Sequence, residues 1–317
     1  MADPDEQSIT ALFRLALPDG RIRLARGPLG EGPVDLLSAG LDVDALLSQD
    51  GEQALAAALA HPAAGPVPGG SRLLAPVQGQ EVWASGVTFE RSRNARNEEA
   101  GPVDFYDRVY DAVRPELFCK ASPGRVRGPG QEVGIRQDSG WDVPEPELGL
   151  VADSTGRLVA LTVGNDMSSR SIEGENPLYL PQAKVFTGSC ALGPALVPLA
   201  EAPELASLVI ELVIHRDGDV LFRDSVPLSA MRRRPDELLE WLYQALEFPV
   251  GVVLLTGTSI VPPAELTLRA GDLVDIAIPG VGTLRNPVVE VGRPIPTSRR
   301  AGDHGNGPTP DLRATHI

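Results

Sequence analysis

The sequence is poor in the residues that build several familiar kinds of site. Its 317 residues contain two cysteines, Cys119 and Cys190, and four histidines. Two cysteines do not make a disulfide framework, and neither has metal-ligand spacing, so a disulfide-stabilised or zinc-binding protein is not expected. No apolar run approaches the length of about eighteen residues that a membrane span needs. The start, MADPDEQ, lacks the basic and apolar regions of a signal peptide, which favours a cytoplasmic protein.

Basic residues are also scarce, since 28 lysines and arginines stand against 43 acidic residues, for a net charge of −15. This charge argues against nucleic acid or an anionic membrane as partner. It does not exclude a small anionic substrate, because a local site can carry the opposite sign. Lysine occurs only at Lys120 and Lys184, and arginine fills the other basic positions. A retained lysine suggests a role that arginine cannot fill, such as an amine that can lose its proton, although chance retention stays open for each.

The pattern along the chain predicts three parts. Residues 8–27 read as a hairpin, and two helical patterns follow, at 36–47 and 52–59, before the proline- and glycine-rich stretch HPAAGPVPGGS. We therefore expect a small N-terminal α/β domain over 1–75. Many short strands follow, with helical patterns only at 105–113 and 235–247, which predicts a mostly β catalytic domain over 76–298. The polar segment 299–317 is predicted to be a flexible tail.

The segment WDVPEPELGLVAD, residues 141–153, places two carboxylates within a strand-like pattern. In an extended chain Glu145 and Glu147 point to the same face. Pro146 fixes the extended backbone and removes one donor, which suits an edge strand or a strand end. A solvated strand edge would explain the pair, and so would a cation between the two charges. The next strand, LVALTVGND, ends at Asp166, and three carboxylates could form an oxygen-rich site for Mg²⁺.

EPELGLV and GNDMSSR, with LLTGTSIV and GDLVDIAIPGVGTLRNP downstream and VWASGVTFERSR upstream, resemble motifs of the fumarylacetoacetate hydrolase superfamily. The similarity extends from about residue 81 to 291, roughly two thirds of the chain. It implies an α+β, mostly β fold, with a catalytic domain built on a rolled, mixed β-sheet. It also implies that Glu145, Glu147 and Asp166 bind Mg²⁺, or Mn²⁺ or Ca²⁺ in some members. By the same analogy, a homodimer or homotetramer is expected.

The superfamily includes hydrolases, decarboxylases, isomerases and dehydratases, so the fold does not fix the reaction. Its hydrolytic members activate water with a histidine paired with a glutamate, after the first strand of the catalytic domain. The corresponding segment here, TFERSRNARNEEAGPVDFYDRVYD, contains no histidine. The four histidines are His61, His215, His304 and His316, in the linker loop, at a hairpin turn and in the tail. Hydrolysis by that dyad is therefore disfavoured.

Two further stretches, RPELFCKASP and GENPLYLPQAKVF, closely resemble the 2-keto-3-deoxy-D-arabinonate dehydratases and the similar xylonate enzymes. Together they contain both lysines. The resemblance implies that the substrate is a 2-keto-3-deoxy pentonate, a small anionic 2-keto acid, and that loss of water gives 2-oxoglutarate semialdehyde. The carboxylate and ketone of such an acid can bind Mg²⁺, which acidifies the C3 protons.

This reaction requires a base and an acid. Lys184 is the candidate base, since a nearby dication favours its neutral amine. Glu116 is the candidate acid for the C4 hydroxyl, with its position set by Lys120 or Arg114. Arg170 is expected to contact the carboxylates. Residues expected to bind substrate are Lys120, Thr258, Arg91 and Ser169.

Plainer interpretations stay open for these residues. Glu116 and Lys120 could form a surface ion pair, and TGT could be a strand-end turn. The predicted lid, with Glu90, Arg91 and Arg93, could be a solvated face. A metal-dependent acylpyruvate hydrolase, with Glu98 or Glu99 activating water, is an alternative function. A non-catalytic binding or scaffolding protein is a third, which the carboxylate triad disfavours.

Overall fold

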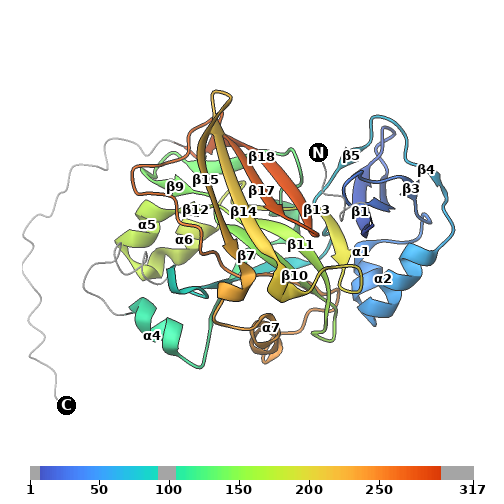
Figure 1. Ribbon diagram of the computed structural model, residues 1–317, viewed down its shortest axis with the longest axis horizontal. Helices are drawn as coiled ribbons and strands as arrows, with labels where there is room; N and C mark the ends of the chain where they lie inside the picture. Colours follow the sequence, from blue (N-terminus) through green and yellow to red (C-terminus); the bar gives the residue numbers. More distant parts are fainter. Residues whose placement is uncertain (1–7, 92–104, 294–317) are drawn as a thin grey trace, which may run out of the picture.

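The computed structural model describes residues 8–91 and 105–293, and strands dominate the described part (Figure 1). The strands are β1 (Thr10–Ala16), β2 (Ile22–Pro28), β3 (Asp35–Leu36), β4 (Gly65–Pro66), β5 (Arg72–Leu73), β6 (Glu81–Gly86), β7 (Glu116–Ala121), β8 (Val133–Arg136), β9 (Asp142–Val143), β10 (Pro146–Ala152), β11 (Leu158–Asp166), β12 (Ser168–Ser169), β13 (Cys190–Pro198), β14 (Val209–Arg216), β15 (Asp219–Pro227), β16 (Val252–Leu255), β17 (Leu273–Ile278) and β18 (Gly282–Val291). The α-helices are α1 (Val43–Leu47), α2 (Gly51–Ala60), α4 (Phe105–Asp111), α5 (Arg170–Glu175), α6 (Leu180–Lys184) and α7 (Pro235–Tyr243). Short 3₁₀ turns are η2 (Pro123–Arg125), η3 (Pro177–Tyr179), η4 (Leu205–Ser207) and η5 (Leu228–Ala230).

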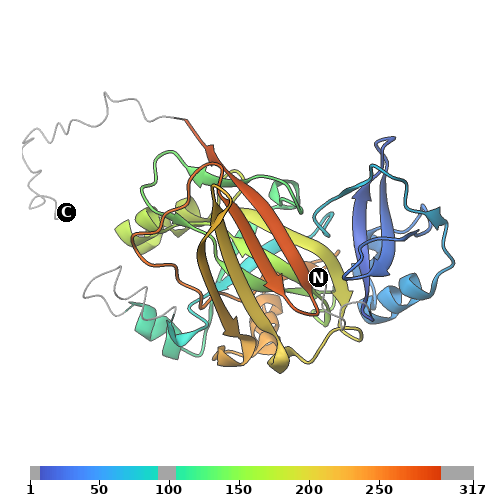
Figure 2. The same ribbon diagram turned by 45° about the horizontal axis from the view of Figure 1, so that its top comes forward.

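Two mixed sheets form the body of the molecule (Figures 1 and 2). The eleven-stranded sheet has the order β4-β3-β2-β1-β13-β11-β10-β16-β6-β7, with β5 also paired with β1. The five-stranded sheet has the order β15-β14-β17-β18-β8. Each contains one parallel pair, β16 with β6 and β18 with β8, among antiparallel neighbours. The mostly β, mixed-sheet fold expected from the sequence is confirmed.

The main hydrophobic core lies between the two sheets. Leu150 of β10 and Leu161 of β11 belong to the same buried cluster as Leu212 of β14 and Ile276 of β17. Because side chains alternate along a strand, the other face of β10 carries Glu147, Gly149 and Val151. The core therefore fixes which face of β10 presents its carboxylates.

The N-terminal segment forms the predicted hairpin, β1 with β2, and α1 and α2 lie below it in the view of Figure 1. Both helices share a buried hydrophobic cluster with strands of the larger sheet. The helix expected from residue 36 begins only at Val43, because Asp35 and Leu36 pair with β2 as β3 and Asp42 caps α1. Strand β1 also pairs with β13, at Leu12 opposite Leu196. The N-terminal sheet thus continues into the larger sheet, and a domain boundary near residue 75 stays a prediction.

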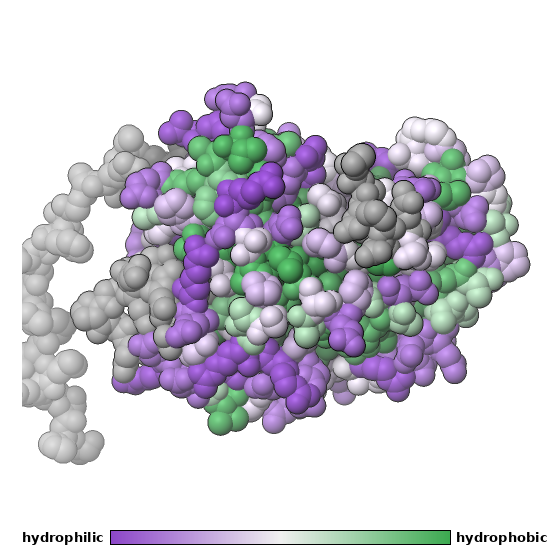
Figure 3. Space-filling view, viewed as in Figure 1, coloured by the Kyte–Doolittle hydropathy of each residue, from purple (hydrophilic) through white to green (hydrophobic). Residues whose placement is uncertain are grey.

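The helices expected near 105–113 and 235–247 are present as α4 and α7. In the described ranges, no helix is long and apolar enough to cross a membrane. The visible face is a mosaic of hydrophilic and hydrophobic residues (Figure 3). The segment predicted to be a flexible tail, 299–317, lies outside the described residues.

Candidate metal and substrate site

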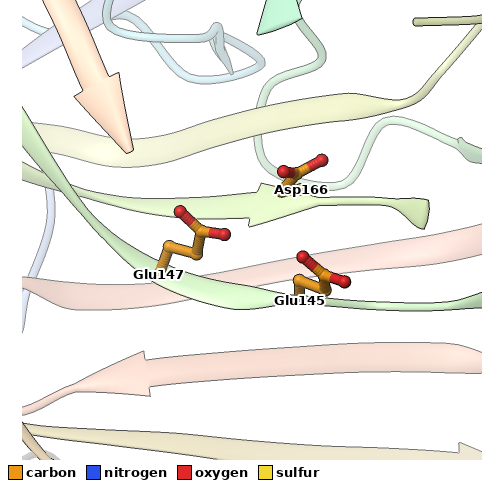
Figure 4. Close-up of side chains that lie close together, drawn as sticks. All are labelled: Glu145, Glu147 and Asp166. Carbon is orange, nitrogen blue, oxygen red and sulfur yellow. The ribbon is translucent and has the colours of Figure 1, made fainter. Parts of the chain in front are cut away.

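The pairing of β10 with β11 brings three carboxylates together. Pro146 lies opposite Asn165, and the Asp166 amide donates to the Glu145 carbonyl at 2.9 Å. Glu145 and Glu147 point to the same side of the strand, and Asp166 reaches them from the end of β11 (Figure 4). Ligand oxygens from all three lie within 4.8 Å of one another. The juxtaposition expected from the sequence is present.

Pro146 occupies the first position of β10, where the missing N–H costs no ladder hydrogen bond. Of the two positions that the sequence favours for this proline, the strand end is confirmed. The edge strand is wrong, because β10 lies between β11 and β16 inside the larger sheet. An interior strand buries both faces, so the carboxylates on it are withdrawn from water.

The three acids are almost completely buried, with exposed fractions of 4% for Glu145 and 1% for both Glu147 and Asp166. Burial, and then the charges of Asp166 and Glu145, raise the pKa of Glu147 well above its usual range. The Gly257 amide opposes these effects by donating to Glu147 Oε2 at 2.6 Å. A divalent cation would relieve the repulsion, and a set of hard carboxylate oxygens suits Mg²⁺. The chemistry of the donor set therefore fits the ion that the sequence predicts.

Gly257 is a glycine for a steric reason. Its φ of +84° lies in the left-handed region, and a Cβ there would come 2.3 Å from Thr88 Oγ1. The Thr88 hydroxyl in turn donates to the Thr256 carbonyl at 2.6 Å. This close approach aims the Gly257 amide at Glu147. The sequence reasoning missed this contact, although TGT and its glycine were visible.

Three cationic side chains surround the triad. Lys184 Nζ donates to Glu145 Oε2 at 2.6 Å, to Asp166 Oδ2 at 3.2 Å and to Ser168 Oγ at 2.7 Å. Arg170 pairs with Glu145 at 3.2 Å, as expected, and Lys120 forms an ion pair with Asp166. Lys184 and Lys120 are both buried. The two lysines of the chain therefore meet at one site.

A small cavity lies beside the triad, with a free volume of about 20 Å³. Of the other predicted residues, Glu116, Thr258, Lys184 and Arg170 line it with the three acids. This volume admits a water-sized species only, so a five-carbon acid requires lining side chains to move. Lining residues to which the sequence reasoning gave no role are Ser85, Gly86, Val87, Phe118, Glu173, Leu180 and Gly257.

Three residues expected to bind substrate lie elsewhere. Lys120 is buried beneath Asp166 and donates to the Met167 carbonyl at 2.9 Å. Ser169 caps α5 by accepting from the Ile172 amide. Arg91 is exposed and pairs with Asp224 of β15 at 2.7 Å. None of the three is among the residues that line the small cavity, and their contacts with substrate stay predictions.

Arg114, offered as a neighbour that positions Glu116, stacks over Trp241 at 4.6 Å from the ring centroid. The two histidines in the described part of the chain, His61 and His215, do not line the cavity, and His215 pairs with Asp275. Glu98, Glu99 and Arg93, assigned to a lid or to water activation, lie outside the described residues.

Asp142 is a buried acid close to this site, 4% exposed, and its Oδ1 has no hydrogen-bond partner within the described residues. Burial raises the pKa of Asp142 from 3.8 to about 6. Because the pKa of Asp142 is higher in the folded than in the unfolded protein, Asp142 costs no stability below about pH 4. Its carboxylate lowers the free energy of unfolding increasingly as the pH rises to about 6 and above. We expect Asp142→Asn to raise the free energy of unfolding at pH 8 by up to about 3 kcal/mol, with little change at pH 4.

Denaturant unfolding at pH 4 and pH 8 measures this difference. Asp138→Asn is the matched control, because Arg136 lowers the pKa of Asp138 and the substitution should destabilise the protein at pH 8. Equal stability of Asp142→Asn and the unmodified protein at pH 8 would show that Asp142 carries no burial penalty.

The mixed sheets and the buried carboxylate triad define a protein of the fumarylacetoacetate hydrolase type. The model of the fumarylacetoacetate (FAA) hydrolase C-terminal family matches residues 91–289, and the chain belongs to this family. It is 50% identical over 216 residues to a probable 2-keto-3-deoxyxylonate dehydratase of Haloferax volcanii, covering 68% of this chain and 74% of the relative. A 2-dehydro-3-deoxy-D-arabinonate dehydratase of Saccharolobus solfataricus is 44% identical over 222 residues, with the same coverage of 68% and 74%.

Similarity to solved structures supports the same family membership. The structure described as 2-keto-3-deoxy-D-arabinonate dehydratase complexed with magnesium and 2,5-dioxopentanoate superposes with a TM-score of 0.76 at 34% identity. The match covers 90% of this chain and 100% of that chain. The family resemblance found in the sequence is thereby confirmed, including its dehydratase branch.

Proposed function

We propose that this chain is a Mg²⁺-dependent dehydratase that removes water from a 2-keto-3-deoxy pentonate to give 2-oxoglutarate semialdehyde. The observation that carries the proposal is the buried triad of Glu145, Glu147 and Asp166 with the Lys184 amine in contact with two of its members. Relatives named as dehydratases of such acids support it. So does the similar structure described with 2,5-dioxopentanoate, which is the semialdehyde that this dehydration would yield.

Glu145, Glu147 and Asp166 would hold the Mg²⁺. When bound there, the ion would polarise the C2 ketone of the substrate and stabilise negative charge that develops on its oxygen. Arg170 and Lys120 fix the orientation of two of these carboxylates through ion pairs with Glu145 and Asp166. The Gly257 amide holds the third.

Lys184 is the proposed base. Its Nζ reaches the small cavity from the last residue of α6, and Ser168 and two carboxylates fix its position. In its neutral form it accepts a proton from C3 of the substrate. Arginine at this position would keep the charge but could not take part, because a guanidinium does not lose its proton in proteins.

Glu116 is the proposed acid, and it lies at the start of β7 on the wall of the same cavity. Its carboxylate packs on Gly86, where a Cβ would come 2.1 Å from Glu116 Oε2. In the protonated form it gives its proton to the leaving C4 hydroxyl. Breaking the C3–H and C4–O bonds releases water and leaves a C3=C4 double bond. Loss of a proton from C5 and protonation of C3 by solvent then move the double bond to C4=C5, which gives an enol. Loss of the enol O–H proton and protonation of C4 convert this enol to the aldehyde.

Further features of this proposal follow from the sequence and the relatives. Thr258 lines the cavity and is proposed to contact the substrate carboxylate. We also propose, as in the sequence-based prediction, that the enzyme acts in the cytoplasm as a homodimer or homotetramer. Lys120, Ser169 and Arg91 are not among the residues that line the small cavity. We propose that Lys120 and Ser169 support the site through their neighbours, and contact of all three with substrate stays a prediction.

The reaction is tested with 2-keto-3-deoxy pentonates beside acylpyruvates, each with Mg²⁺ present. We expect the pentonate to yield one five-carbon semialdehyde, detected by coupling to an aldehyde dehydrogenase. In deuterated water, mass spectrometry should find deuterium at C3, because that carbon is reprotonated from solvent. Elimination keeps every substrate carbon in one product, whereas hydrolysis of an acylpyruvate gives two acids. Efficient cleavage of acylpyruvates with the pentonates untouched would replace the dehydratase by a hydrolase.

We expect Glu116→Gln to slow loss of the C4 hydroxyl by about 100-fold, within the range for loss of a general acid. Exchange of the C3 protons with solvent should fall much less, because Lys184 is intact. Comparing deuterium exchange into the substrate with release of product separates the two steps. An equal fall in exchange and product release would show that Glu116 does not act as the acid.

A further inference from the structure

A second, larger cavity is lined by the segment that directly follows Lys184 in the chain. It has a free volume of about 580 Å³, and Val185, Phe186, Thr187 and Gly188 form part of its wall. Lys184 itself lines the small cavity beside the triad. Consecutive residues of the chain therefore line the two cavities, and the larger one has no role in the proposed reaction.

The larger cavity is strongly basic in a chain whose net charge is −15. Four arginines line it, Arg125, Arg127, Arg136 and Arg293, and one carboxylate, Asp138. Arg136 neutralises Asp138 by donating two hydrogen bonds to its carboxylate, of 2.8 and 2.6 Å. For the other three guanidinium groups, the described residues provide no carboxylate partner. Such a concentration of uncompensated charge raises the local concentration of anions.

The wall of this cavity is preformed. The Gly134 amide donates to the Gly188 carbonyl at 2.9 Å, and a Cβ on Gly134 would lie 2.2 Å from the Thr187 carbonyl oxygen. Backbone packing this close leaves the segment 187–188 little freedom against β8. Arg136 is held by Asp138, by the Gln182 carbonyl at 3.1 Å and by stacking at 5.7 Å from the Phe186 centroid. A ligand would meet an ordered surface, which lowers the entropy cost of binding.

Arg127, which lines this cavity, is incompletely hydrogen-bonded within the described residues. Its Nε is buried and has no hydrogen-bond partner within the described residues, although its backbone is held to β13 through Cys190 and Leu192. A buried guanidinium nitrogen without a partner is costly, and phosphate or carboxylate oxygens are the acceptors that match it best. Arginine is also the residue that binds such groups with two parallel hydrogen bonds.

We propose that this basic cavity binds a small polyanion, a molecule with two or more phosphate or carboxylate groups. The volume exceeds what a single inorganic ion needs, and three uncompensated guanidinium groups call for more than one negative charge. The site is distinct from the cavity at Glu145, Glu147 and Asp166, where the acidic groups would repel such a ligand. The proposal does not depend on the dehydratase reaction.

Isothermal titration calorimetry with pyrophosphate tests the site, on full-length protein freed of metal by a chelating resin, in about 0.15 M salt to screen surface attraction. Tricarballylate serves as the carboxylate probe, and acetate as the singly charged reference. We expect saturable binding of pyrophosphate or tricarballylate at least tenfold tighter than that of acetate. The double variant Arg125→Gln/Arg127→Gln should weaken it at least tenfold.

Arg223→Gln is the matched control, because Arg223 is an exposed arginine of β15 outside this cavity. Its binding of pyrophosphate should equal that of the unmodified protein. Circular dichroism establishes that the double variant is folded, and light scattering gives its molar mass. Equal weakening in both variants, or no saturable heat in the unmodified protein, would overturn the proposal. So would a changed molar mass of the double variant, which would assign the cavity to contact with a second copy of the chain.

Discussion

Replacing Glu147 with glutamine is expected to abolish turnover and to weaken Mg²⁺ binding by about 100-fold or more. Glu147 is 1% exposed, and its carboxylate lies within ligand reach of Glu145 and Asp166. Glutamine keeps the shape of the side chain and can still accept from the Gly257 amide. The substitution therefore removes one charge and one anionic ligand with little change in packing. Titration calorimetry with Mg²⁺ and the coupled assay measure the two losses.

The stability of the metal-free protein should move in the opposite direction. Burial and the acidic neighbours raise the pKa of Glu147. At a pH above the range in which glutamate usually ionises, the charge on Glu147 therefore lowers the stability of the folded protein. Glutamine removes this penalty, and we expect Glu147→Gln to have a higher Tm than the unmodified protein at pH 8 without metal. Mg²⁺ should raise the Tm of the unmodified protein only.

Glu265→Gln provides a control for this experiment, because Glu265 is exposed and does not line the small cavity. It should leave Mg²⁺ affinity, turnover and Tm unchanged. Full turnover of Glu147→Gln in excess chelator, at the rate that the control reaches with Mg²⁺ present, would end the metal hypothesis.

The triad was predictable because it depends on local rules. Strand alternation puts Glu145 and Glu147 on one face, and the antiparallel return of the next strand brings Asp166 opposite them. Alternation alone would put Glu116 and Lys120 on one face of β7, but the pairing of β7 with β6 shifts by one residue at Lys120. The sequence did not reveal that Glu116 and Lys120, near the two ends of this strand, contact different parts of the site. Four residues of strand span about 13 Å, so Glu116 reaches the cavity while Lys120 lies beneath Asp166.

Contacts between distant segments could not be predicted. The Gly257 amide and Glu147 are 110 residues apart, and Thr88 and Thr256 are 168 apart. Their proximity depends on β16 being placed beside β6 and β10, a choice of sheet order that no local pattern specifies. The pairing of Arg91 with Asp224 depends likewise on where β15 lies. The sequence therefore identified the residues of the candidate site better than it identified the residues that they contact.

We expect Lys184→Arg to lower turnover by at least about 100-fold, a rise of about 2.7 kcal/mol in the barrier, although the positive charge is kept. Lys184 Nζ lies 2.6 Å from Glu145 and 2.7 Å from Ser168, in a site where the side chain is 3% exposed. A guanidinium in this place still pairs with carboxylates, but it cannot accept a proton from C3. Turnover is measured together with Mg²⁺ affinity and Tm, so that a folding or metal-binding defect is recognised.

Because arginine is also larger than lysine, a chemical rescue separates basicity from fit. Lys184→Cys, alkylated with 2-bromoethylamine, regains an amine at nearly the same distance from the backbone. Because position 184 is buried, the alkylation must reach buried thiols, so Cys119 and Cys190 can react too, and the unmodified protein treated in the same way is the control. Recovery of turnover on alkylation of Lys184→Cys, with no change in the control, assigns the base to the amine. If Lys184→Arg turns over within about tenfold of the unmodified protein, below about 1.4 kcal/mol, Lys184 acts only through its charge.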